Sequence, residues 1–128
     1  MMNEFTIKSE VSCLTEMMKS KFIAFVIPVK DIDSFKERLE KIKKENSKAK
    51  HVVYAYRIGM NSKSTDDREP KGTAGRPLLE LLMKKNFNNT AIIVVRYYGG
   101  VQLGAGRLLR TYVNSAVNAI NKAEVIEL

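Results

Sequence analysis

The sequence has little of what disulfides, metal sites and membrane spans require. Its 128 residues include one cysteine, Cys13, and one histidine, His51, so neither an internal disulfide nor a zinc ligand set is expected. The longest apolar run, 22–29, is far shorter than the roughly 20 residues of a membrane helix. The first ten residues lack the basic and apolar regions of a secretory signal. We therefore expect a cytoplasmic protein without metal, cofactor or membrane contact.

What the sequence does contain is typical of one globular domain with a basic surface. Hydrophobic residues make up 45% and charged residues 28%, which predicts a single domain over 1–128 with a normal core. The formal net charge is +8. Residues 74–122 contain seven basic residues and one acid, so the net charge of that segment is +6. This charge favours an acidic partner such as nucleic acid.

The spacing of apolar residues predicts seven elements in the order β-β-α-β-α-β-α. Strands are expected at 3–13, 22–29, 52–58 and 90–95, and helices from Asp31 or Asp33 to Asn46, over 78–82, and after Gly106. Residues 14–20 are expected to form a connector, and Ser34 with Glu37 matches a capping box. His51 opens the third strand. Because the sequence indicates no carboxylate or cysteine partner for His51, we assign this histidine no acid–base role.

The chain is organised around residues 90–110, where an apolar strand passes through a glycine-rich turn into a basic helix. Two phosphate-binding templates fail there. A Walker loop needs Gly-Lys-Ser/Thr, but Arg107 and Leu108 follow Gly106, and Leu109 occupies the third glycine position of a dinucleotide fingerprint. A more general anion site remains, formed by helix N-terminal N–H groups and two arginines. Tyr97 and Tyr98 offer one stacking surface, since adjacent strand residues face opposite ways.

The segment 59–75 shows no apolar periodicity and predicts a loop of seventeen residues, long enough to suggest a function. Its acids Asp66, Asp67 and Glu69 raise the alternatives of a magnesium site or an acid–base pair. Their spacing supports neither one strongly. Asx turns or local charge pairs are the more usual role of such acids.

Four motifs in this order resemble the IMPACT/YigZ family of small translation-associated proteins. They are Lys19-Ser20-Lys21-Phe22-Ile23-Ala24, His51-x-x-Tyr54-Ala55-Tyr56-Arg57, Asp66-Asp67-x-Glu69-Pro70-x-Gly72-Thr73-Ala74-Gly75-x-Pro77, and Arg96-Tyr97-Tyr98-Gly99-Gly100-x-x-Leu103-Gly104-x-Gly106. The family usually has Gly at the position of Arg68 and Ser at that of Lys71, so this loop is more basic and stiffer.

The resemblance implies an α+β fold like the second domain of ribosomal protein S-five and domain IV of elongation factor G. In that fold, a two-layer arrangement, helices cover one face of a four-stranded mixed sheet. Eukaryotic members resemble regulators that block activation of an amino-acid-sensing translation kinase. They carry an N-terminal partner domain, and bacterial members usually add a ferredoxin-like C-terminal domain. We expect this chain to correspond to the shared domain alone.

The leading interpretation is a non-enzymatic, translation-associated module that binds RNA or the ribosome through the glycine-rich turn. The residues expected to bind are Arg96, Tyr97, Tyr98, Gly99, Gly100, Gly104, Gly106, Arg107 and Arg110. The loop expected to face them contributes Asp66, Asp67, Glu69, Gly72, Thr73 and Gly75. Two alternatives stay open: a protein-interaction regulator of translation or stress signalling, and a hydrolase-like enzyme acting on an acidic or phosphorylated small molecule. No catalytic residue and no oligomeric state is assigned.

Overall fold

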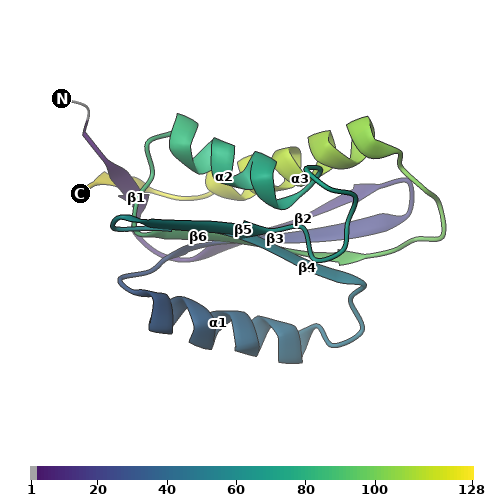
Figure 1. Cartoon of the computed structure of the whole chain (residues 1–128), viewed down its shortest axis with the longest axis horizontal. Coiled ribbons are helices and arrows are strands. Elements are labelled where there is room, and N and C mark those ends of the chain that lie inside the picture. Colours follow the sequence, from purple (N-terminus) through teal and green to yellow (C-terminus); the bar gives the residue numbers. More distant parts are fainter. Residues whose placement is uncertain (1–2) are drawn as a thin grey trace.

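The computed structural model describes residues 3–128 as a five-stranded sheet between layers of helices, with a separate two-stranded sheet (Figure 1). The elements in chain order are β1 (Phe5–Ile7), β2 (Val11–Met17), β3 (Ser20–Pro28), α1 (Ile32–Glu45), β4 (His51–Ile58), β5 (Asn61–Thr65), α2 (Gly75–Lys84), β6 (Thr90–Tyr97), α3 (Ala105–Ile120) and β7 (Val125–Glu127). The predicted α+β class is confirmed. Within residues 3–128, no helix is long and apolar enough to cross a membrane.

The five strands are ordered β2-β3-β6-β4-β5, and every neighbouring pair is antiparallel. The prediction of a four-stranded mixed sheet was therefore wrong. The additional strand β5 lies in the segment expected to be a loop. Its sequence NSKST is polar throughout and shows no apolar alternation. Its side chains are exposed or half-exposed at the edge of the sheet, so backbone hydrogen bonds to β4 are enough to form the strand.

The N-terminal segment forms two strands where one was expected. β1 pairs with β7, near the C-terminus, whereas β2 forms a hairpin with β3 and extends to Met17 through the predicted connector. The side chains of β2 alternate between half-buried and exposed, and Leu14 stands on the exposed side with 53% of its surface accessible. An apolar residue on the outer face interrupts the alternation that sequence reasoning uses to recognise a strand.

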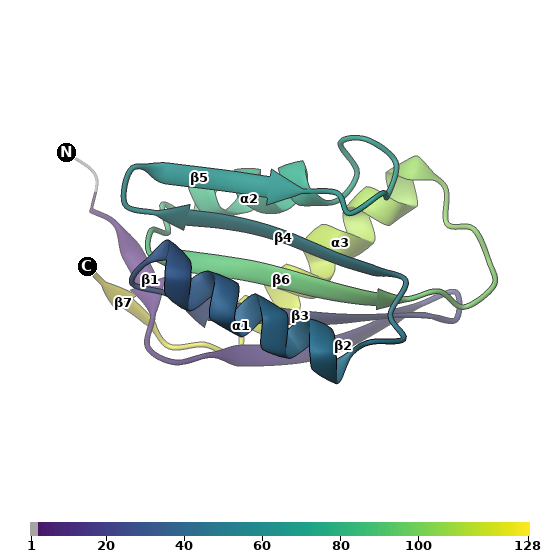
Figure 2. The same ribbon diagram turned by 60° about the horizontal axis from the view of Figure 1, so that its bottom comes forward.

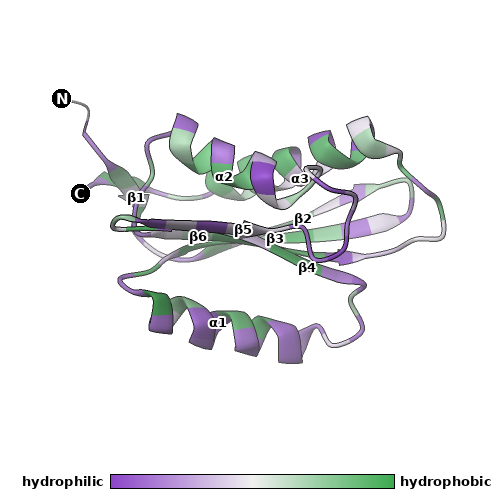
Figure 3. Cartoon of the chain, in the orientation of Figure 1, coloured by the Kyte–Doolittle hydropathy of each residue, from purple (hydrophilic) through white to green (hydrophobic). Residues whose placement is uncertain are grey.

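Helices cover both faces of the sheet, not one face as expected (Figures 1 and 2). α1 lies alone on one side, and α2 and α3 lie on the other. α1 buries Phe35, Leu39 and Ile42, and much of its ribbon is coloured hydrophilic (Figure 3). The central strand β6 explains the three layers, since it is apolar on both faces. Ile92 and Val94 belong to the core beneath α2 and α3, and Ile93 and Val95 to the core beneath α1.

The three helices begin differently. At α1 the carboxylate of Asp31 accepts the N–H of Ser34 at 2.7 Å, which lowers the pKa of Asp31, so Asp31 is the cap in place of the predicted box. At α2 the carboxylate of Asp66 accepts the N–H groups of Gly72, Ala74 and Gly75. α3 begins after a glycine and has no side-chain cap.

Gly99 lies where β6 leaves the sheet, directly against the backbone of Lys19 in the β2–β3 hairpin. A Cβ atom at Gly99 would overlap the carbonyl of Lys19, whereas one at Gly106 would meet only the flexible end of Arg110, at 3.3 Å. We predict that Gly99→Ala lowers the free energy of unfolding by about 1–3 kcal/mol through overpacking. The matched Gly106→Ala change should stay within about 1 kcal/mol of the wild type. Urea denaturation of both variants tests this, and equal losses would contradict it.

Candidate functional site

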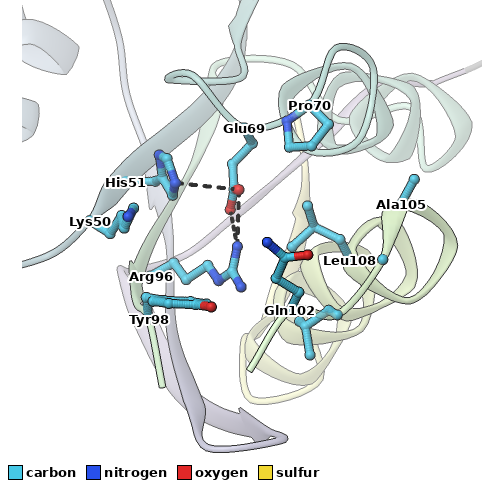
Figure 4. A pocket seen from close by; sticks show the side chains of 11 residues that line it. Lys50, His51, Glu69, Pro70, Arg96, Tyr98, Gln102, Ala105 and Leu108 are labelled. Atoms are coloured by element: carbon cyan, nitrogen blue, oxygen red, sulfur yellow. Dashed lines mark hydrogen bonds and ion pairs between the residues drawn. The ribbon is translucent and has the colours of Figure 1, made fainter. Parts of the chain in front are cut away.

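A buried carboxylate, Glu69, is the centre of a charged cluster at the end of the sheet where β6 stops (Figure 4). Nη1 of Arg96 donates to both of its oxygens, at 2.9 and 2.8 Å, and the hydroxyl of Tyr112 donates to Oε2. Nε2 of His51 lies 3.4 Å from Oε1. Glu69 and Arg96 are 7% and 5% exposed, so the cluster is an ion pair largely removed from water.

The four side chains come from four segments that the antiparallel sheet brings together. Arg96 in β6 stands directly opposite His51, the first residue of β4. Tyr112 reaches the cluster from the buried face of α3, and Glu69 comes from the loop between β5 and α2. Phe22 of β3 completes the packing, with its ring edge-on to Tyr112 and 5.4 Å below the Arg96 guanidinium.

The loop is held in place by its own acids. Oδ2 of Asp67 accepts the N–H of Val52 at 2.6 Å, and the carbonyl of Asp67 lies 2.6 Å from Nδ1 of His51. Asp67 and Arg68 adopt left-handed backbone conformations, with φ of 43° and 68°. The turn therefore forms with Arg68 at the position where the family usually has glycine. All three loop acids, Asp66 included, accept hydrogen bonds from within the domain.

The hydrogen bonds of the cluster indicate that Nδ1 of His51 and the hydroxyl of Tyr112 each carry a hydrogen. Because a carbonyl oxygen can only accept, Nδ1 of His51 carries the hydrogen that is donated to Asp67. Burial and the hydrogen bond to Glu69 both raise the pKa of Tyr112 well above its ordinary value, so its hydroxyl stays a donor. Among residues 3–128, no group of three or more His, Cys, Asp or Glu side chains is placed to hold a metal ion.

A pocket of about 360 Å³ opens over this cluster. Figure 4 shows His51, Glu69 and Arg96 converging on one side, with Tyr98 below and Gln102, Ala105 and Leu108 across from them. The lining residues share one location, between the start of β4, the end of β6 and the first turn of α3; they are Lys50, His51, Glu69, Pro70, Arg96, Tyr98, Gln102, Leu103, Gly104, Ala105 and Leu108.

The predicted binding residues lie in two different environments. Gly100, Gly104, Gly106, Arg107 and Arg110 are exposed, as a binding surface requires. Arg96, in contrast, is buried and its charge is matched by Glu69.

The two tyrosines face opposite ways, as expected for adjacent residues. Tyr97 points toward α1, where its hydroxyl donates to Oδ1 of Asn46 at 2.6 Å. Tyr98 is 42% exposed and lies beside the charges of Lys50 and Arg96, 5.2 and 5.6 Å from its ring centre. Tyr98 is therefore the one of the pair that offers a surface.

The remaining predicted loop residues support the loop from within. Thr73 is buried and donates its hydroxyl to the carbonyl of Pro70. Gly75 packs so closely on the backbone of Thr65 that no Cβ atom fits there. Gly72 and Gly75 donate their N–H groups to Asp66 of the same loop, and none of the three residues lines the pocket.

Sequence reasoning missed three residues of this site. It found no partner for His51, because Glu69 is eighteen positions away and only strand pairing brings the two together. Tyr112 matched a core position of the helix, and its hydroxyl was not considered. Lys50 was not singled out among many lysines. The position of His51 at the start of a motif that resembles the family's was the one available signal.

The fold and the site define a small three-layer α+β domain with a buried Glu–Arg–Tyr–His cluster beneath an open pocket. The chain belongs to the IMPACT family: the family model described as the Impact N-terminal domain matches residues 18–120. The resemblance read from the four motifs is thus confirmed.

Relatives in several organisms agree with this assignment. IMPACT family member YvyE of Bacillus subtilis is 40% identical over 126 residues, 96% of this chain and 58% of that protein. YigZ of Escherichia coli is 35% identical over 118 residues, 86% of this chain and 58% of that protein. Protein IMPACT of Rattus norvegicus is 40% identical over 95 residues, 70% of this chain and 30% of that protein. The chain thus spans little more than half the length of these bacterial relatives.

A solved structure supports the fold at higher coverage. A protein described as hypothetical superposes with a TM-score of 0.93 at 29% identity, over 100% of this chain and 65% of its own. The α+β architecture is therefore shared with a solved structure over the whole of this chain.

We predict that Glu69→Gln lowers the free energy of unfolding by about 3–5 kcal/mol, because it leaves the buried Arg96 cation without a counter-charge. The matched control is Glu80→Gln, which makes the same chemical change in an exposed ion pair with Arg76. The control should cost less than about 1 kcal/mol. Urea midpoints measure both, and a Glu69→Gln variant as stable as the control would refute the buried ion pair.

Tyr112→Phe should cost about 1.5–3 kcal/mol at neutral pH, because it removes a hydrogen bond to a charged group. The raised pKa of folded Tyr112 makes this stabilisation fully present below the ordinary tyrosine pKa near 10. Above that pH the unfolded chain releases the proton while the folded protein retains it, so the stability difference between wild type and variant should shrink. Denaturation at pH 7 and pH 10.5 checks this; a constant difference would contradict it.

Proposed function

We propose that this domain is a non-enzymatic, translation-associated module that binds RNA through the surface around the β6–α3 turn. The observation that supports it best is a group of exposed cations from three separate segments. Lys19 comes from the β2–β3 hairpin, Lys50 precedes β4, and Arg107 and Arg110 occupy the first turns of α3. The role in translation is what the resemblance to the family implies.

The contacts of these residues support a common surface. The backbone of Lys19 lies against Gly99, and a guanidinium nitrogen of Arg107 contacts the sulfur of Met18 in the same hairpin. The guanidinium of Arg110 lies beside Gly106. These cations therefore surround the glycine-rich turn, and cations so arranged bind phosphates independently of base sequence.

The acids of the neighbouring loop favour this proposal over a partner-docking loop. Asp66 and Asp67 accept backbone N–H groups, and Glu69 is paired with Arg96. All three carboxylates are thus already engaged in contacts within the domain. The same engagement of Glu69 by two donors gives an enzyme no free catalytic base there, so binding is the function that the geometry supports best.

We predict that Arg107→Glu with Arg110→Glu weakens binding of single-stranded RNA at least tenfold and lowers the slope of log affinity against log salt. Two lost phosphate contacts correspond to a slope change of about 1.4. Filter binding at several salt concentrations measures both quantities. The matched control is Lys41→Glu with Lys44→Glu, the same charge change on exposed residues of α1 across the sheet, which should leave the slope nearly unchanged.

Equal slopes for both double variants and the wild type would refute RNA binding through this turn. Affinity capture with and without nuclease then separates the alternatives. Recovery of ribosomal material that survives nuclease would favour the protein-interaction regulator, whereas nuclease-sensitive recovery agrees with the RNA-binding module.

A further inference from the structure

We propose that the pocket beside Tyr98 binds a nucleoside monophosphate unit, with its phosphate at the N-terminus of α3. The ligand is either a free mononucleotide or the 5′-terminal nucleotide of a phosphorylated RNA. The two sources share one chemistry, a phosphomonoester attached to a nucleoside. This inference concerns the pocket itself and does not depend on RNA binding by the exposed arginines.

The N-terminus of α3 lacks the anion that the other two helices have. α1 has the carboxylate of Asp31 and α2 that of Asp66, each accepting backbone N–H groups. α3 is sixteen residues long, has no side-chain cap and no acid in its first turn, and the pocket wall is formed there by Gly104 and Ala105. Its first N–H groups and the positive end of its dipole therefore face a space that suits an anion.

A buried donor without an acceptor is the second, independent observation. The Arg96 side chain lines the pocket, is only 5% exposed, and its Nε–H has no partner within the part of the chain that the structure describes. Its Nη1 is taken by Glu69, and its Nη2 only reaches Ser20, at 3.4 Å. Buried donors are normally satisfied, so an orphaned one on a side chain that lines a pocket points to a missing acceptor.

The charge of the pocket has the sign that an anion requires. Arg96 neutralises Glu69, and the exposed ammonium of Lys50 remains as an additional positive charge on the pocket wall. A phosphomonoester carries a charge of about −1.5 to −2 and three free acceptor oxygens. Helix N–H groups, Lys50 and Arg96 are three kinds of donor on the walls of one pocket, which fits that group better than a diester with two free oxygens.

The rest of the pocket suits the nucleoside. Pro70, Leu103 and Leu108 are apolar walls, Tyr98 is an exposed ring, and Gln102 is an exposed amide with both a donor and an acceptor. The volume of about 360 Å³ lies in the range of small-ligand sites, roughly 300–1,000 Å³. The lining thus combines charged donors, an exposed aromatic ring and apolar walls, the chemistry that a phosphate joined to a nucleoside requires.

The test is an NMR titration of the whole chain with AMP, adenosine or inorganic phosphate, following the backbone N–H signals of residues 105–107. AMP should shift these signals to saturation, adenosine should leave them in place, and phosphate should shift them at higher concentration. Ala105→Asp provides the helix with its own carboxylate and should raise the Kd for AMP about tenfold or more. Ala105→Asn, of the same size without the charge, is the matched control and should bind within about threefold of wild type.

Acids in the first turn stabilise helices, so Ala105→Asp is expected to fold, and its thermal unfolding confirms this independently of binding. Equal binding of AMP and adenosine, absent shifts at residues 105–107, or an unchanged Kd in Ala105→Asp would each overturn the site. Two oligoribonucleotides of one sequence, with 5′-phosphate or 5′-hydroxyl ends, distinguish the sources. A preference for the phosphorylated end identifies RNA termini, and AMP binding without that preference identifies the free nucleotide.

These outcomes separate the two proposals. AMP binding with no RNA binding would retain the pocket and reject the RNA-binding module. RNA binding that depends on Arg107 and Arg110 but is indifferent to the 5′ end, without AMP binding, would retain the module and reject the pocket.

Discussion

The ion pair between Glu69 and Arg96 is the interaction on which this end of the molecule depends. It ties the loop before α2 to the central strand and, through Tyr112, to α3. Two charges removed from water are stable only when their remaining hydrogen-bonding capacity is used, and here most of it is. The orphaned Nε–H of Arg96 is the exception, and it lies beside the pocket. One ion pair thus both closes the fold and forms the floor of the candidate site.

The central strand β6 both requires the helices on the two faces of the sheet and leads the chain into the candidate site. Its side chains are apolar toward both faces, which requires helices on both sides of the sheet. At its end the chain must leave the sheet, cross the β2–β3 hairpin at Gly99 and enter α3 at a glycine with φ of 79°. Only a residue without Cβ adopts that conformation at low cost. The exposed arginines follow at once, so the basic surface is a consequence of where the strand stops.

Strongly periodic or apolar segments could be recognised from sequence, and weakly patterned ones could not. The helix beginning after Asp31 and the strand beginning at Thr90 matched their predictions closely. An amphipathic helix has a clear period, and a strand buried on both faces is a short, uninterrupted apolar run rich in β-branched residues. β5 was missed because its side chains are polar. The part of β2 from Leu14 to Met17 was missed because Leu14 faces outward. The sheet order and the second helical layer follow from pairings between distant segments, which no local pattern encodes.

By itself, the sequence determined the family, the α+β class, the charge of the 74–122 segment and the glycines of the β6–α3 turn. These follow from residue types and short spacings, which are local properties. Only the tertiary structure decided which charges are free. It paired Arg96 with Glu69, brought His51 within 3.4 Å of the same carboxylate, and left Arg107 and Arg110 exposed. The reason is physical: a charge is available to a ligand only when nothing in the fold neutralises it, and that depends on contacts between residues far apart in the chain.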